Sequence, residues 1–220
     1  MKYILLLFNL SFLLSGPLKL EEVESFLNAK YEGDTSAVVA FISDEFQYLN
    51  TPYVGLGIKA FYVDGSLLVT ELINESIRNQ ISIGDRIYEF NNKVVTPDGL
   101  FTKGPVGQIQ KLLLTKMNDT LFTEIKIPLS MQQQKENSES YLNSIIEYSK
   151  IWYEYDIIIH DYFSKKDKVF VHYSWEGSKE ENSEVYHFTI IEILTLEKKT
   201  GLIKKIESLW SEYQFRNQFK

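Results

Sequence analysis

The stretch Tyr53-Val54-Gly55-Leu56-Gly57-Ile58 decides the fold predicted for the middle of this 220-residue chain. Its two glycines allow a tight backbone path in which successive N–H groups face one concavity, an anion-binding nest. Further along lies Ser82-Ile83-Gly84-Asp85-Arg86-Ile87, whose glycine and capping aspartate predict a second tight turn. Segments 58–62, 67–73 and 86–91 read as short strands with turn signals between them. The pattern predicts a small module rich in β-strands.

The order of these motifs resembles the PDZ family, especially the PDZ modules of bacterial carboxy-terminal processing proteases. Gly104-Pro105-Val106-Gly107, followed by helical spacing over 107–116, resembles the same bacterial type. The resemblance covers 53–129 and implies a small β-sandwich or barrel with two helices, which we place at residues 52–129. The 220 residues leave no room for a peptidase domain beside it.

The resemblance also implies a site for a peptide. Backbone N–H groups of the glycine loop would hold the carboxylate at a partner's chain end, and segment 58–62 would pair with the partner's backbone. An apolar pocket would take the partner's last side chain. The residues implied for this peptide-binding site are Gly55, Leu56, Gly57, Ile58, Ile109, Leu112 and Leu113.

Residues 18–51 and 130–220 predict a second, discontinuous domain around that module. Helical spacing over 20–31 and 141–155 predicts two longer helices, and the polar run 130–140 is typical of a linker. Four long aromatic strands follow and predict a strongly curved antiparallel sheet. These strands are 156–163, 168–175, 185–196 and 202–215.

Several fragments of this outer domain are similar to nuclear transport factor 2-like, or SnoaL-like, domains. They are Phe26-Leu27 with Tyr31 and Gly33-Asp34, Asp167–Val171 with Trp175 and Gly177, and Phe188–Glu197 leading to Gly201-Leu202-Ile203. The resemblance implies a cone of curved sheet wrapped on helices, with an apolar mouth. The predicted class is therefore α+β, a PDZ domain inserted into such a cone.

The cone domain has two readings. In the first, the domain binds a small apolar ligand or forms a homodimer. In the second, it is a small-molecule isomerase or cyclase. Some members of that superfamily catalyse such reactions with an Asp, Tyr or His in the pocket. His172 and His187, on neighbouring strands, together with Tyr173 and Trp175 are the pocket candidates. Sheet packing is the alternative role for these aromatic residues.

His160 and Asp161 face opposite sides of a regular strand, so both enter one pocket only if a bulge intervenes. A metal site of His160, His172 and His187 is disfavoured, because no carboxylate lies at a convincing ligand spacing. We therefore expect no metal, no cofactor and no catalytic residue.

Composition narrows the function further. The net charge of −7 without a basic face argues against nucleic-acid binding. The absence of cysteine excludes disulfides and a thiolate nucleophile.

The leading prediction is an exported adaptor that captures protein C-termini or extended peptides and is not an enzyme. A third hypothesis is that the PDZ module is an internal regulator, with its peptide groove occupied by the chain's own segment Asn217–Lys220.

The N-terminus predicts export. Met1-Lys2-Tyr3, the apolar run Ile4–Leu14 and Ser15-Gly16 resemble a secretory signal over residues 1–16. The run is too short for an ordinary membrane-spanning helix. Pro17 and a poor cleavage site leave an uncleaved anchor as the alternative. We expect a periplasmic or secreted protein.

Overall fold

The structure is a computed structural model that describes residues 18–100, 102–211, 215 and 217–219. The chain divides into two compact units. Unit 1 contains the chain up to Thr51 and from Lys135 onward, and unit 2 is Pro52–Gln134. The predicted signal segment lies outside the described residues. Within the described residues, no helix has the length and apolar character needed to cross a membrane.

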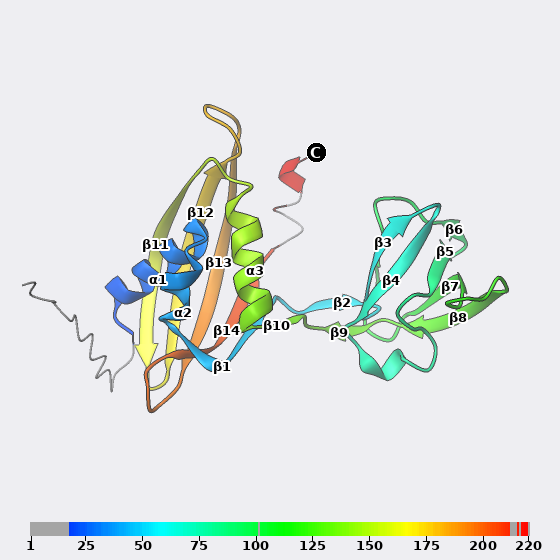
Figure 1. The fold of residues 1–220 in the computed structure, drawn as a ribbon, viewed down its shortest axis with the longest axis horizontal. Coiled ribbons are helices and arrows are strands. Elements are labelled where there is room, and N and C mark those ends of the chain that lie inside the picture. Colours follow the sequence, from blue (N-terminus) through cyan, green and yellow to red (C-terminus); the bar gives the residue numbers. More distant parts are fainter. Residues whose placement is uncertain (1–17, 101, 212–214, 216, 220) are drawn as a thin grey trace, which may run out of the picture. The chain divides into compact units, whose positions relative to one another are not determined.

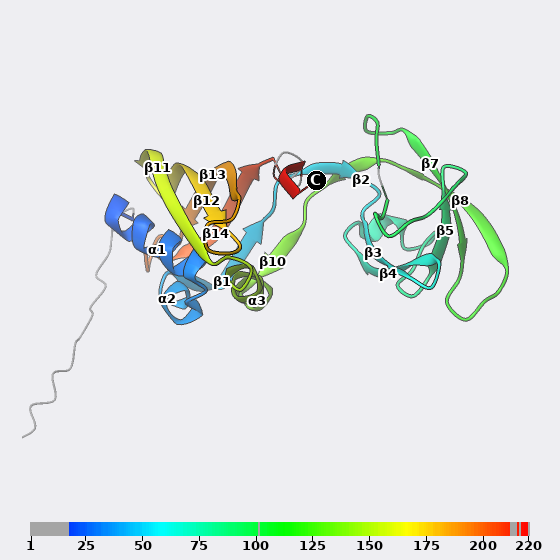
Figure 2. The same ribbon diagram turned by 90° about the horizontal axis from the view of Figure 1, so that it is seen from above.

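Unit 1 is built on a six-stranded sheet with the order β10-β1-β14-β13-β12-β11. Only β1 and β14 pair in parallel; the other neighbours are antiparallel. The sheet curves around helices on one face (Figures 1 and 2). Its strands are β1 Ile42–Leu49, β10 Lys135–Asn137, β11 Glu154–Lys165, β12 Lys168–Ser178, β13 Val185–Leu196 and β14 Ile203–Trp210.

Three helices cover the concave face of that sheet: α1 Leu20–Glu32, α2 Thr35–Val39 and α3 Ser138–Ser149. Helix α1 begins where the Glu22 carboxylate accepts a 2.7 Å hydrogen bond from the backbone N–H of Lys19. It ends at Gly33, whose φ of 80° is the left-handed conformation that glycine adopts readily. The side chain of Asn137 caps α3. Large side chains from helices and sheet, Phe26, Leu27, Tyr173, Trp175 and Leu194 among them, form the buried core.

Unit 2 has a core of its own, formed by side chains that include Leu67, Ile87, Leu112 and Ile127. Its main sheet has the order β3-β4-β5-β7-β8, with β6 added to β5, while β2 pairs with β9. The strands are β2 Tyr53–Gly55, β3 Ile58–Val63, β4 Ser66–Leu72, β5 Arg86–Phe90, β6 Lys93–Val94, β7 Ile109–Thr115, β8 Phe122–Pro128 and β9 Ser130–Gln132.

The α+β class and the curved, mainly antiparallel sheet are confirmed. Two local predictions are wrong. Within residues 107–116, Ile109–Thr115 form strand β7 instead of a helix, because β5 and β8 pair with both of its edges. The polar run 130–140 contains β9, β10 and the start of α3, since its backbone pairs with β2 and β1. For the same reason unit 2 extends to Gln134, where the sequence placed the end of its module at Leu129.

Candidate functional site

The residues predicted to bind a peptide do not form a groove in unit 2. Leu56 and Leu112 belong to the buried core, whereas Ile109 is 54% exposed. Leu113 precedes the buried Leu114 on strand β7, where successive side chains face opposite sides of the sheet. In the described part of unit 2, the 3-10 helix Glu75–Ile77 is the one helical segment. The second helix that would wall a peptide groove is therefore missing.

The glycine loop is also occupied by the chain's own side chains. Gly57 has a φ of 78°, and a Cβ built there would collide with Asn74 and lie 2.9 Å from Oε1 of Gln132. The carbonyl of Gly57 accepts hydrogen bonds from the backbone N–H groups of Ile73 and Asn74. The loop thus packs against neighbouring segments of unit 2. The predicted peptide-capturing adaptor is wrong, because its implied residues are divided between the buried core and the surface of unit 2.

The four candidates in the cone do not come together either. Tyr173 and Trp175 are fully buried between sheet and helices. His172 precedes Tyr173 on β12 and therefore points to the opposite, outer face of the sheet. His187 lies on that outer face as well, 49% exposed and 3.2 Å from a carboxylate oxygen of Glu176. Neither histidine enters the interior of the cone.

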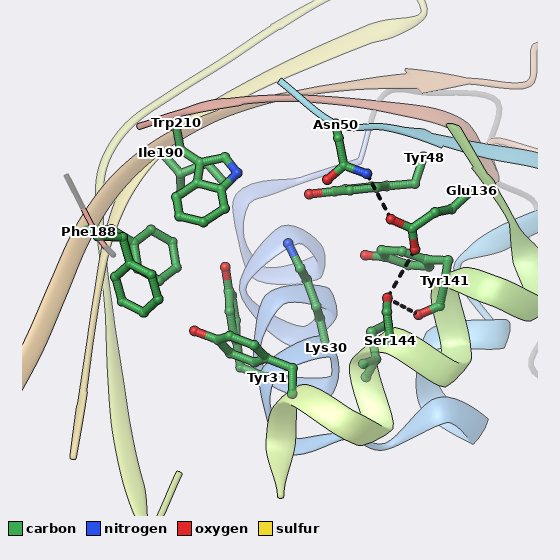
Figure 3. A pocket seen from close by; sticks show the side chains of 13 residues that line it. Lys30, Tyr31, Tyr48, Asn50, Glu136, Tyr141, Ser144, Phe188, Ile190 and Trp210 are labelled. Atoms are coloured by element: carbon green, nitrogen blue, oxygen red, sulfur yellow. Dashed lines mark hydrogen bonds between the residues drawn. The ribbon is translucent and has the colours of Figure 1, made fainter. Parts of the chain in front are cut away.

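A cavity of about 230 Å³ lies in unit 1 between the concave face of the sheet and helices α1 and α3. Polar side chains converge at one end, and aromatic and aliphatic side chains form the other (Figure 3). The lining residues are Lys30, Tyr31, Tyr48, Asn50, Glu136, Tyr141, Ser144, Ile145, Tyr148, Phe188, Ile190, Trp210 and Phe215. The cavity therefore fits a small ligand with a mainly apolar body and a polar group at one end.

The charged group at the base of this cavity is the ammonium of Lys30, from α1. Its Nζ donates a 2.6 Å hydrogen bond to Oε1 of Glu192, which is fully buried on β13. Nζ also lies 3.4 Å from the hydroxyl of Tyr173 and 4.9 Å from the ring centre of Tyr31. Within the part of the chain that the structure describes, Oε2 of Glu192 accepts no hydrogen bond. Burying an ion pair is costly and rarely increases stability, so its place beside a cavity points to a functional role.

Tyrosine hydroxyls surround this ammonium and remain protonated. Burial raises the pKa of Tyr31, Tyr141 and Tyr173 well above 10.0, and the negative charge of Glu192 raises each of them further. Burial likewise raises the pKa of Tyr48. At neutral pH these phenols are O–H donors. Tyr141 lines the cavity, and its hydroxyl has no hydrogen-bond partner among the described residues.

A carboxylate forms the opposite wall of the polar end. Glu136 lies on β10 directly across from Tyr48 on β1. Its Oε1 accepts a 2.8 Å hydrogen bond from the amide of Asn50, and its Oε2 accepts one of 3.1 Å from the hydroxyl of Ser144. Figure 3 shows this carboxylate and the Lys30 ammonium directed into the same polar end, with Tyr141 between them. The site thus combines one fixed proton acceptor with a group of donors.

The sequence contains a signal for these residues. Val23, Phe26, Leu27 and Tyr31 mark the apolar face of α1, and Lys30 lies on that same face. Glu192 similarly interrupts the buried series of Ile190 and Leu194 on β13. A charge on an apolar face is rarely buried unless it is paired, so the two positions indicate a buried ion pair.

No family model and no curated protein matches the sequence. Solved structures with a similar backbone include an NTF2-like protein of unknown function from Cytophaga hutchinsonii, with 11% identity, a TM-score of 0.41, and 93% of this chain and 98% of that chain covered. A putative SnoaL-like polyketide cyclase from Jannaschia sp. CCS1 has 7% identity and a TM-score of 0.41, with 89% of each chain covered. An LEH-like epoxide hydrolase from M. tuberculosis has 11% identity and a TM-score of 0.40, with 89% of this chain and 84% of that chain covered.

Proposed function

We propose that unit 1 is a small-molecule isomerase or cyclase that moves a proton at a carbon next to a carbonyl group. One observation carries the proposal: a carboxylate, an ammonium and a phenol face the polar end of one mainly apolar cavity, and the phenol forms no hydrogen bond to the residues described by the structure. General acid–base catalysis of this kind requires a base and an electrophilic partner on opposite sides of the substrate.

In this reaction the Glu136 carboxylate removes the proton from the carbon atom. The Lys30 ammonium and the Tyr141 hydroxyl donate hydrogen bonds to the carbonyl oxygen, which becomes an enolate. The proton then returns from Glu136 to another carbon of the same molecule. Alternatively, the enolate carbon attacks a second carbonyl and closes a ring, and the proton passes from Glu136 to the alkoxide oxygen that this attack forms. Asn50 and Ser144 hold the base in place through the hydrogen bonds that they donate to it.

Proton exchange tests this proposal without knowledge of the natural substrate. The protein is incubated in D₂O with a panel of cyclic ketones and diketones, and loss of the α-proton signal is followed by NMR. We expect Glu136→Gln to slow the exchange by about 10²–10⁴-fold, the range typical of a general base. Substrate binding should persist in this variant; it is followed by the change in tryptophan fluorescence, to which Trp210 in the cavity wall contributes.

Glu139→Gln is the matched control, because Glu139 is exposed at the start of α3 and does not line the cavity. It should leave the exchange rate unchanged. Equal exchange rates in the native protein, Glu136→Gln and Glu139→Gln would contradict the assignment of Glu136 as the base.

We also propose the finer assignments of fold and location. Unit 1 is a nuclear transport factor 2-like cone, which its helices on a curved sheet and its interior cavity support. Unit 2 is a PDZ-type strand scaffold that has lost its peptide groove, which the motif order from Gly55 to Asp85 supports. Residues 1–16 act as an export signal. Sequencing the N-terminus of the protein recovered from a cell envelope fraction tests the last assignment.

A further inference from the structure

The outer face of the sheet in unit 1, away from the cavity, carries all three histidines of the chain. Two of them, His160 on β11 and His172 on β12, have ring centres 5.0 Å apart. Nδ1 of His172 lies 3.0 Å from Oδ2 of Asp161, and Nε2 of His160 lies 2.6 Å from Oγ of Ser174. The proton-transfer reaction proposed for the cavity uses none of these groups.

A β-bulge creates this arrangement. The pairing of β11 with β12 shifts between Ile159 and Asp161, so that Asp161 lies opposite His172 and His160 is the extra residue. In a regular strand His160 and Asp161 would point to opposite faces. The bulge instead leaves both of them exposed on the outer face. Bulges are conserved features that often redirect a side chain next to a functional site.

The hydrogen bonds leave one nitrogen of each ring available. His172 uses Nδ1 for Asp161, which leaves Nε2, and His160 uses Nε2 for Ser174, which leaves Nδ1. A histidine that binds a metal through one ring nitrogen commonly donates a hydrogen bond from the other nitrogen to a carboxylate. This hydrogen bond fixes the orientation of the ring and makes the metal-binding nitrogen a better ligand. Asp161 has this relation to His172.

We propose that His160 and His172 together bind a divalent transition-metal ion on this outer face. An ion held by two imidazole nitrogens at about 2.0–2.1 Å, with an angle of about 90–110° between them, places the ring centres about 4.5–5 Å apart. The observed separation is 5.0 Å. In the described part of the chain no three histidine or carboxylate side chains are grouped as metal ligands, so water completes the coordination. Among the common divalent ions, Cu²⁺ should bind this pair most tightly.

Titration of Cu²⁺ into the purified full-length chain, followed calorimetrically, tests the proposal. We expect His160→Gln and His172→Gln each to lower the affinity by at least about tenfold. Asp161→Asn should lower it about tenfold as well, because His172 loses its orienting carboxylate. His187→Gln is the matched control: this third histidine shares the face but pairs with Glu176, and its replacement should leave the affinity unchanged.

Electron paramagnetic resonance of the Cu²⁺-loaded native protein gives a second readout that needs no variant. Coupling to two imidazole nitrogens is the expected spectrum, and coupling to one nitrogen is expected in either single variant. The proposal is overturned if the native protein binds no Cu²⁺, if its spectrum shows no pair of imidazoles, or if His187→Gln weakens binding as much as His160→Gln.

Discussion

At the scale of single residues, the buried ion pair of Lys30 and Glu192 is the feature of unit 1 least explained by stability. A buried pair gives little net stability, but removing one partner leaves an uncompensated charge. We therefore expect Lys30→Met to lower the free energy of unfolding of unit 1 by about 3–5 kcal/mol. The double variant Lys30→Met/Glu192→Leu should recover most of that loss. Urea unfolding, followed by tryptophan fluorescence, measures both.

In the Lys30→Met/Glu192→Leu double variant, we expect the proposed activity to stay low although the free energy of unfolding recovers. The double variant folds but lacks the ammonium, so proton exchange in D₂O should stay low although stability returns. A double variant as unstable as the single one would show that the two side chains contribute by packing and not as a charge pair. Recovery of activity with stability would remove Lys30 from the proposed chemistry.

The Tyr141 hydroxyl, which forms no hydrogen bond within the described ranges, leads to the opposite expectation for stability. A hydroxyl in a cavity wall that forms no hydrogen bond to the described residues adds little stability, so Tyr141→Phe should leave the free energy of unfolding unchanged or raise it by up to about 1 kcal/mol. Loss of an oxyanion donor should at the same time reduce proton exchange by about 10²–10³-fold. Tyr153→Phe, at a 61% exposed tyrosine, should change neither quantity. A Tyr141→Phe variant that loses both stability and activity would contradict this role.

At the scale of elements, the sequence predicted the long strands and helices of unit 1 but misassigned one strand of unit 2. Ile109, Leu112 and Leu113 fit helical spacing, yet Gln110, Leu112 and Leu114 are the buried series of β7. The two-residue period was not recognisable in the sequence, because one of its buried positions is the polar Gln110. The Oε1 atom of Gln110 accepts a 2.6 Å hydrogen bond from Nδ2 of Asn91. The bulge at His160 was equally hidden, since bulges depend on how a partner strand pairs.

The strand assignment of 109–115 has a direct test. Leu112 is fully buried in β7, so Leu112→Ala should destabilise unit 2 by about 2–5 kcal/mol. Ile109 is 54% exposed, so Ile109→Ala should cost less than about 0.5 kcal/mol. Both are measured by urea unfolding followed by far-UV circular dichroism. A helix that used Ile109 and Leu112 on one face would give similar losses for the two variants.

At the scale of the whole molecule, residues 53–129 contain eight Lys/Arg and eight Asp/Glu, so the entire net charge of −7 lies in the flanking segments. This contrast predicts two differently built units, and each unit has its own core. The cavity could not be predicted in the same way. Its polar end combines Lys30 from α1, Tyr48 and Asn50 at the end of β1, and Glu136 from β10. Asn50 and Glu136 are separated in sequence by all of unit 2, and only the pairing of β1 with β10 brings them together.

Two separate cores predict two separate unfolding transitions. All three tryptophans, Trp152, Trp175 and Trp210, lie in unit 1, so tryptophan fluorescence reports on that unit alone. Ile87→Ala in the core of unit 2 should lower the stability seen by circular dichroism by about 2–5 kcal/mol and leave the fluorescence midpoint in place. Leu194→Ala in the core of unit 1 should lower the fluorescence midpoint. If Ile87→Ala shifts both probes together, the units unfold as one cooperative body, and unit 2 then stabilises the strands that hold Asn50 and Glu136 at the cavity.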